Sequence, residues 1–322
     1  MADVKKTQHF SENWETILFN IDLQPTSACD PFAGACNLVE YAPDADWELY
    51  DIDVKNPRVI YRDTLLNPPD YSGKTVITNP PYLAKNKTKE FDKIFEKYQT
   101  DDLYKASILS IMGCENGILI IPLNFFTDEN TKDIRRKFLS QYKVSYVNVF
   151  TQPVFKNTTY NVCSFYFEKG KTDTVTFYDY FASKRYIIQL CEEFGYRVGG
   201  SFYNSFEKEK PIFSRTLENK ANTNIFVNCL DTRAENFHLE YRPGFVYKGE
   251  KTDRIFATLN CEENLSEEQQ KKLCEEFNSR INKQRAVYGN LLFTNYRDAG
   301  RKRISLEDVY KICTKLLRFI QS

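Results

Sequence analysis

Short apolar runs that each end in a polar residue recur through the first 80 residues of the chain. These runs end at Asp30, Asp53, Asp63 and Asn79. Such runs, interleaved with helical stretches, are typical of the parallel strands of an α/β sheet. Ligands of open parallel sheets bind along the carboxyl ends of the strands. The pattern therefore predicts an α/β sheet with a ligand site at that edge.

The last of these runs, Thr75–Thr78, leads into Asn79-Pro80-Pro81-Tyr82. Each proline removes a backbone donor and fixes φ, so the pair ends the strand and holds the carbonyl groups of Asn79 and Pro80 in a rigid arrangement. The Asn79 side-chain oxygen and the Pro80 carbonyl can converge on an NH2 group, while the Tyr82 ring covers the planar ring that carries it. A rigid turn without such a role is the alternative for the four residues taken alone.

Small residues follow the first expected strand, in the segment Ser27–Leu38. This segment has an acid, Asp30, at its front and one glycine, Gly34, as expected where a strand turns tightly into a helix and a ligand approaches the backbone. The next expected strand ends near Asp51 and Asp53, where nucleotide-binding α/β folds hold ribose hydroxyls with a carboxylate. Solvated charges at a strand end are the alternative for either acid alone.

Composition limits the class of protein and its chemistry. The chain has 322 residues, of which 42% are hydrophobic and 27% charged, as in globular proteins long enough for two domains. No apolar run approaches the ~18 residues that span a membrane, and no signal-peptide pattern opens the chain. Nine cysteines without a CxxC pair and only two histidines, His9 and His238, argue against zinc and histidine general-base catalysis. We expect a cytosolic or nucleoplasmic protein with reduced thiols and no metal.

The alternation of expected strands and helices fades after about Lys184. Further strands are expected at 117–122, 144–150 and 162–167, and helices at 12–19, 89–98, 102–112 and 127–142. Beyond Lys184 the chain becomes aromatic, polar and rich in asparagine, and 266–288 is expected to form one charged helix capped by Ser266. We therefore predict two domains, 1–184 and 185–322.

The loop 154–161, between the last two of these strands, carries the aromatic residues Phe155 and Tyr160. A hairpin at the end of the sheet would place one of these rings near the ligand site. Packing in the core is the alternative for each ring.

Two basic segments could contact phosphates. One follows the proline pair directly, and the other lies in 281–322, which holds 9 Lys or Arg against 3 Asp or Glu although the net charge of the chain is zero. The candidate residues are Lys85, Lys87, Lys89, Arg297, Arg301, Lys302 and Arg303. Phosphate contact is the prediction for both segments, and a solvated surface is the alternative.

With these residues assembled, the chain resembles the S-adenosylmethionine-dependent N6-adenine DNA methyltransferases, in which an Asn-Pro-Pro-Tyr motif follows the cofactor motif and a target-recognition domain lies last. The resemblance covers roughly residues 7–169. It implies a Rossmann-like class I methyltransferase sheet with helices on both faces, followed by a C-terminal α+β target-recognition domain. Two features depart from the family: Cys36 stands where a glycine is usual, and the carboxy-terminal part matches no recognition domain that we can name.

The resemblance also implies roles for single residues. Catalysis falls to Asn79, Pro80, Pro81 and Tyr82. Tyr82 and Phe155 stack on an extruded base. The positions implied in binding S-adenosylmethionine are Thr7, Phe10, Asp30, Pro31, Phe32, Gly34, Asp51, Ile52, Asp63 and Asn79.

The activity so implied is methyl transfer from S-adenosylmethionine to adenine N6 in a specific sequence of double-stranded DNA, after base flipping. A restriction-modification setting, with a cognate restriction endonuclease as partner, follows from the same resemblance. It also implies a cytoplasmic location in a prokaryotic or viral host cell. Asn-Pro-Pro-Tyr also occurs in methyltransferases of RNA and of protein glutamine, which remain alternatives, as does a non-catalytic nucleic-acid-binding subunit.

Overall fold

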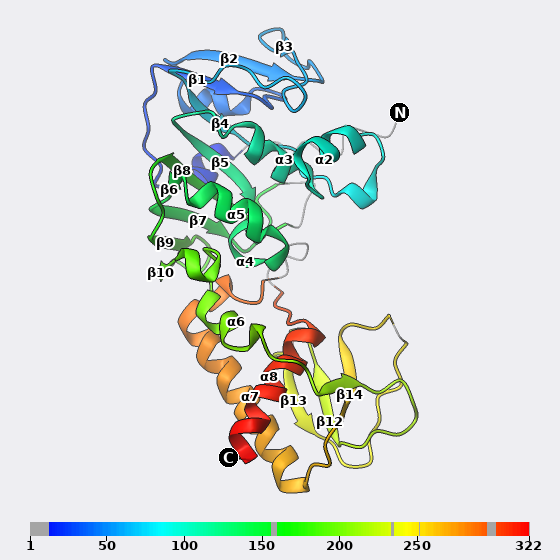
Figure 1. Cartoon of the computed structure of the whole chain (residues 1–322). Helices are drawn as coiled ribbons and strands as arrows, with labels where there is room; N and C mark the ends of the chain where they lie inside the picture. Colours follow the sequence, from blue (N-terminus) through cyan, green and yellow to red (C-terminus); the bar gives the residue numbers. More distant parts are fainter. Residues whose placement is uncertain (1–12, 156–159, 233–234, 251, 295–300, 322) are drawn as a thin grey trace. The chain divides into compact units, whose positions relative to one another are not determined.

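The structure is a computed structural model that describes residues 13–155, 160–232, 235–250, 252–294 and 301–321. The chain divides into two compact units, one that ends at Arg197 and one that begins at Val198 (Figure 1). The expected boundary between residues 184 and 185 lies inside strand β10 (Lys184–Gln189), which pairs with β9 (Thr174–Asp179). Within the described residues, no helix is long and apolar enough to cross a membrane.

The first unit is built on one large, mostly parallel sheet. Its strands lie in the order β10-β9-β7-β8-β5-β4-β1-β2-β3, and β6 pairs with β8. The strand order reverses at β1, because β2 lies on one side of it and β4 on the other. Strand β8 runs antiparallel to β5 and β7. The strands are β1 (Ser27–Asp30), β2 (Asp46–Asp51), β3 (Ile60–Tyr61), β4 (Thr75–Thr78), β5 (Asn116–Pro122), β6 (Tyr142–Lys143), β7 (Tyr146–Phe150) and β8 (Val162–Lys169). This order confirms the predicted Rossmann-like class I methyltransferase sheet.

Both faces of this sheet are apolar, so both are covered. Ile118 and Ile120 of β5 share an apolar cluster with Ile17 of the short helix α1. Successive residues of a strand point to opposite faces, so Phe167 of β8 lies on the other face of the sheet. There its ring lies 5.1 Å from that of Phe138. The helices are α1 (Trp14–Ile17), η2 (Asn37–Tyr41), η3 (Lys85–Lys87), α2 (Asp92–Tyr98), α3 (Leu103–Ser110), α4 (Asn124–Thr127), η4 (Glu129–Thr131), α5 (Lys132–Leu139) and η5 (Glu192–Phe194).

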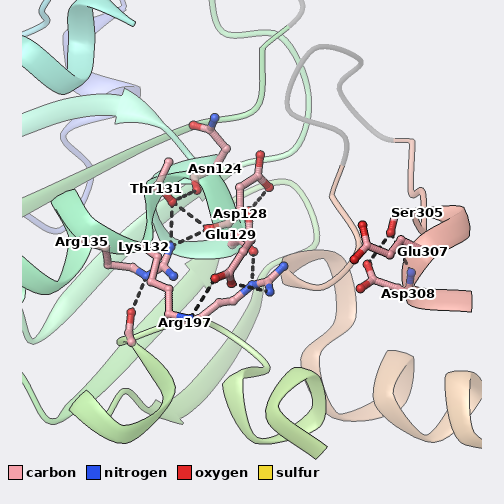
Figure 2. A network of polar contacts seen from close by, with 12 residues as sticks. Asn124, Asp128, Glu129, Thr131, Lys132, Arg135, Arg197, Ser305, Glu307 and Asp308 are labelled. Atoms are coloured by element: carbon pink, nitrogen blue, oxygen red, sulfur yellow. Dashed lines mark hydrogen bonds and ion pairs between the residues drawn. The ribbon is translucent and has the colours of Figure 1, made fainter. Parts of the chain in front are cut away.

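A fully buried arginine fastens the last segment of the first unit to its helices (Figure 2). Arg135 Nε donates to the carbonyl of Gly195 over 2.7 Å, and Nη1 donates to Thr131 Oγ1 over 2.7 Å. Arg197 Nε donates to the carbonyl of Thr127 over 2.7 Å. Burial lowers the pKa of Arg135 to about 9. Carbonyl dipoles thus hold this cation, and its bond to Gly195 attaches the last segment of the first unit to helix α5.

The second unit is a four-stranded antiparallel sheet with helices on one face. The strand order is β11-β14-β12-β13, and inward residues such as Val227 and Leu259 share one core with Leu273 and Ile312. The elements are α6 (Gly200–Glu207), β11 (Phe213–Arg215), β12 (Ile225–Asn228), β13 (His238–Tyr241), β14 (Phe256–Cys261), α7 (Glu267–Tyr288), η6 (Gly289–Leu291) and α8 (Leu306–Gln321). The predicted α+β composition is confirmed.

Two local features of this unit follow from side-chain hydrogen bonds. Ser266 Oγ accepts from the backbone of Gln269 while the Gln269 side chain accepts from the backbone of Ser266, which gives α7 the predicted cap. On the same helix, Asn278 pairs with both backbone groups of Leu239, over 3.0 and 2.8 Å. Strand β13 lies at the edge of its sheet, so Asn278 takes the place of a neighbouring strand.

Candidate active site

The loop after β1 turns through two left-handed residues. Gly34 has φ 52° and Cys36 has φ 66°, a backbone region that glycine enters without steric cost. Cys36 therefore occupies a conformation suited to the glycine that is usual there. The loop begins at Asp30, whose Oδ1 accepts from the backbone N–H of Phe32 over 3.0 Å.

Asp51, at the end of β2, fastens this loop with both carboxylate oxygens. Oδ2 accepts from the backbone N–H of Gly34 and Oδ1 from that of Asp53, each over 2.8 Å. The side chain is buried, and burial raises its pKa. A carboxylate oxygen has two lone pairs, so Asp51 can hold the loop and still accept from a ligand.

The end of β4 lies beside the end of β1, as the sheet order requires. Thr78 Oγ1 donates to Asp30 Oδ1 over 2.7 Å, and both residues are buried. Burial raises the pKa of Asp30 to about 7, against the opposing effect of its hydrogen bonds from Thr78 and Phe32. Asn79 follows Thr78 directly and is partly exposed at the carboxyl edge.

Tyr82 is buried, with an exposed fraction of 5%. Its hydroxyl oxygen lies 2.7 Å from Asn79 Oδ1 and 2.7 Å from the carbonyl oxygen of Ile120. The rings of Tyr104 and Tyr160 meet the Tyr82 ring edge to face, at centroid distances of 6.2 and 6.1 Å. In this structure the ring is thus packed inside the unit, and its hydroxyl contacts the acceptor of Asn79.

One pocket at the carboxyl edge brings six of the predicted site residues together. These are Pro31, Phe32, Asp51, Ile52, Asp63 and Pro81. Asp30, Gly34 and Asn79 do not line it, although hydrogen bonds or chain continuity tie each of them to residues that do. The pocket also includes Phe91 and Ile94, which the sequence analysis left unassigned. Their spacing of three residues at the start of α2 was the available signal.

The other predicted residues lie elsewhere. Phe155 has an exposed fraction of 5% and packs in the apolar cluster of Phe150 and Val162, so its ring is in the core. Lys85, Lys87 and Lys89 are exposed directly after the motif. Three predicted residues, Thr7, Phe10 and Arg297, lie outside the described ranges.

The remaining basic positions belong to the second unit. Arg301 is exposed, whereas Lys302 Nζ donates to the carbonyl of Gly289 over 2.7 Å. Arg303 Nη2 donates to the carbonyl of Arg254 over 3.2 Å. Lys302 and Arg303 therefore already use some of their hydrogen-bond donors in contacts within the chain.

Asp102 is a residue near the motif that the sequence analysis missed. Its Oδ1 accepts from the backbone N–H of Leu83 over 3.1 Å and from that of Tyr104 over 3.3 Å. The residue caps α3 and, through Leu83, contacts the segment that follows Tyr82. Burial raises its pKa to about 6. An aspartate directly before a helical stretch was the available signal.

A comparison with protein families identifies the larger part of the first unit. Residues 46–192 match the model of the family described as N-6 DNA Methylase. This part of the chain thus matches the N-6 DNA methylase family. The matched range includes Asp51, Asp63 and the motif at Asn79, so the family resemblance expected from these residues is confirmed. No curated protein matches the chain.

Solved structures similar to the chain include three methyltransferase subunits. A modification subunit of a candidate type I restriction enzyme from Vibrio vulnificus is 14% identical, with a TM-score of 0.44 over 55% of this chain and 48% of that one. The EcoKI M protein is 17% identical (TM-score 0.39; 51% and 46%), and the methyltransferase subunit of a type I system from Streptococcus thermophilus is 14% identical (0.39; 54% and 47%). The chain thus spans about half the length of these proteins.

The methylase domain implies S-adenosylmethionine as the methyl donor, and the pocket suits that cofactor. Its apolar walls include Phe32, Ile52 and Phe91, which can cover an adenine ring. Its carboxylates, Asp51 and Asp63, can accept from hydroxyl and amine groups. Among the described residues, no group of three or more His, Cys, Asp or Glu side chains could hold a metal ion.

Proposed function

We propose that the chain methylates the exocyclic nitrogen of adenine in DNA, with S-adenosylmethionine as donor. The observation that carries this proposal is the convergence at one sheet edge of the pocket with Asp51 and Ile52 and the Asn79–Tyr82 motif. Thr78 links the loop beside the pocket to the Asn79–Tyr82 motif, because it contacts Asp30 and precedes Asn79.

Three side chains of the pocket are proposed to hold the cofactor. Asp51 would accept from the ribose hydroxyls, Ile52 would pack on the adenine ring, and Asp63 would accept from the adenine amine. Ile52 has an exposed fraction of 40%, so an apolar ring placed on it would bury surface that is now in water. When bound, S-adenosylmethionine supplies an activated methyl group on its sulfonium.

Asn79 and Pro80 are proposed to orient the target amine. The lone pair of adenine N6 is delocalised into the ring, which makes the nitrogen a weak nucleophile. Asn79 Oδ1 and the Pro80 carbonyl would each accept one N6 hydrogen and so draw the nitrogen toward tetrahedral geometry. This role requires positioning and fixed dipoles and no histidine. Pro81 fixes the backbone that carries both acceptors.

Tyr82 and Phe155 are the residues proposed to stack on the flipped base. The Tyr82 hydroxyl contacts Asn79 Oδ1, so an incoming amine would exchange with a phenol at this acceptor. Both rings are buried, so stacking would require each to leave its present neighbours. Stacking is worth ~1 to 3 kcal/mol per base, which would offset much of the cost of flipping.

Double-stranded DNA is the proposed substrate, and the setting is proposed to be a restriction-modification system, with a restriction endonuclease as partner. The first unit would bind cofactor and catalyse transfer, and the second unit would recognise the target sequence. Lys85, Lys87 and Lys89 are exposed beside the motif, which supports their proposed contact with phosphates.

A transfer assay tests the proposal. The purified chain is incubated with methyl-labelled S-adenosylmethionine and with duplex DNA, total RNA or protein extract in parallel. The proposal predicts label in duplex DNA as N6-methyladenine. Asn79→Ala should abolish the transfer and leave cofactor binding nearly intact, since Asn79 does not line the pocket. Label in RNA or protein alone would reject DNA as substrate, and wild-type turnover by Asn79→Ala would reject the role of Asn79.

A further inference from the structure

The segment directly after the motif is attached to the start of helix α3. Leu83 O accepts from the backbone N–H of Leu103 over 3.0 Å, and Lys85 N–H donates to the carbonyl of Asp101 over 2.8 Å. Ala84 and Asp102 form an antiparallel bridge between these two bonds. The segment 83–85 is therefore paired along its length with 101–103.

One carboxylate oxygen completes this pairing. Asp102 Oδ1 accepts from Leu83 N–H and from Tyr104 N–H, so a single atom caps α3 and holds the residue next to Tyr82. The same cap places Tyr104, whose ring meets that of Tyr82 edge to face. Tyr104 is itself fixed at its far end, because its hydroxyl donates to Asn124 Oδ1 over 3.1 Å.

We propose that Asp102 is a positioning residue for the Asn79–Tyr82 motif, acting through Leu83 on one side and Tyr104 on the other. The inference rests on the proposed function for its catalytic consequence. It assigns Asp102 no contact with substrate or cofactor, since Asp102 does not line the pocket. Without its oxygen, the segment that carries Tyr82 and the exposed lysines would lose the bond nearest the motif.

The role requires an acceptor at the right distance and not a charge, and substitutions separate these properties. Asp102→Asn keeps an acceptor oxygen of the same reach and a residue suited to a helix cap. Asp102→Ser keeps a cap for α3 but has a shorter side chain, so Leu83 N–H should lose its acceptor. Ser266→Ala is the matched control, because it removes the cap of α7 in the other unit.

Limited trypsin digestion provides a readout that needs no activity. Lys85, Lys87 and Lys89 are exposed trypsin sites in the attached segment and its continuation. Cleavage there should accelerate about tenfold in Asp102→Ser, the effect on local opening of losing one ordinary hydrogen bond. Asp102→Asn and Ser266→Ala should be cut at these sites at the wild-type rate.

Steady-state methyl transfer provides the second readout. In Asp102→Ser, kcat should fall by about 10- to 100-fold, since small misplacements of reacting groups cost that much, while the KM for S-adenosylmethionine stays within about twofold. Asp102→Asn should restore kcat.

Unchanged cleavage in Asp102→Ser, or a loss in Asp102→Asn equal to that in Asp102→Ser, would overturn the proposal. A wild-type chain that transfers no methyl group would instead reject the proposed function, and the digestion would still test the attachment.

Discussion

Thr78 Oγ1 donates a hydrogen bond of 2.7 Å to Oδ1 of Asp30, so the last residues of β4 and β1 touch inside the sheet. Burial raises the pKa of Asp30 from 3.8 to about 7. A raised pKa in the folded state means that the carboxyl contributes stability in acid, fully present below the unfolded pKa. This contribution is lost as the pH rises from there through the folded value of about 7.

Asp30→Asn should remove this pH dependence. The variant should gain stability relative to wild type as the pH rises from about 3.8 to about 7, by at most roughly 1.4 kcal/mol per pH unit. The measurement is unfolding followed by tryptophan fluorescence, which reports on the first unit because Trp14 and Trp47 are the only tryptophans of the chain. Exposed Asp44→Asn is the control, and parallel curves for both variants would contradict the prediction.

Asp51→Ala should weaken S-adenosylmethionine binding by about tenfold or more, because hydrogen bonds to a charged group contribute ~1.5 to 3 kcal/mol each. The substitution removes both the proposed ribose acceptor and the acceptor of Gly34 N–H. Titration calorimetry measures the affinity. Asp53→Ala is the matched control, because Asp53 ends the same segment but pairs with Lys55 over 3.2 Å. Equal affinity in wild type and Asp51→Ala would remove Asp51 from the site.

Replacing Lys85, Lys87 and Lys89 together by glutamine should weaken DNA binding and its salt dependence. Removal of one cation from a phosphate lowers the slope of log K against log salt by about 0.9, so the slope should fall by up to about 2.7. Fluorescence anisotropy over a salt series measures this slope.

The control for these lysines is Lys137, Lys143 and Lys171 replaced by glutamine, which makes the same change of charge. Lys143 pairs with Glu168, opposite the first residue of β5, and therefore lies at the amino end of the sheet. If both triple variants lose equal affinity, the lysines after the motif have no special role.

Cys36→Gly should be more stable than Cys36→Ala by about 1 kcal/mol, because any side chain in the left-handed region clashes with the following carbonyl. Both substitutions remove the buried thiol, so the comparison isolates the effect of φ 66° at this position. Denaturant unfolding followed by tryptophan fluorescence measures the difference. An alanine variant as stable as the glycine variant would show that the loop relaxes at no cost.

Most of the first unit could be predicted because its signals are local. Strand β4 occupies the predicted residues Thr75–Thr78, since two prolines follow an apolar run. The helix predicted at 127–142 is shorter and begins at Lys132, because α4 and η4 precede it. Strands β9 and β10 were not predicted, since a hairpin added to a sheet edge has little periodicity of its own.

The second unit was harder to predict for a physical reason. Strand β12 pairs with β13 across a loop and also with β14, where Phe226 lies opposite Thr258 far along the chain, and no local pattern encodes this second pairing. Helix α8 was missed although Val309, Ile312, Cys313 and Leu316 recur at helical spacing and are buried. That spacing was a sufficient local signal for a helix.

The candidate site, too, could be predicted only where local sequence patterns determine it. The pocket residues at strand ends could be predicted because parallel strands meet at one edge. The burial of Phe155 was one of the two possibilities for that ring. The burial of Tyr82 could not be predicted, since it depends on side-chain rotamers and on rings such as Tyr104 that approach from other elements.

The pairing of Asn278 with Leu239 also bears on how the second unit can associate. An open strand edge invites a further extended segment, from another copy or from an unfolding neighbour, and so seeds aggregation. At Leu239 both backbone groups are already engaged by a helix side chain, so an invading segment would have to displace an amide that folding holds in place. Binding of a partner by strand addition is therefore disfavoured at Leu239, and a partner at this edge would have to bind through side chains.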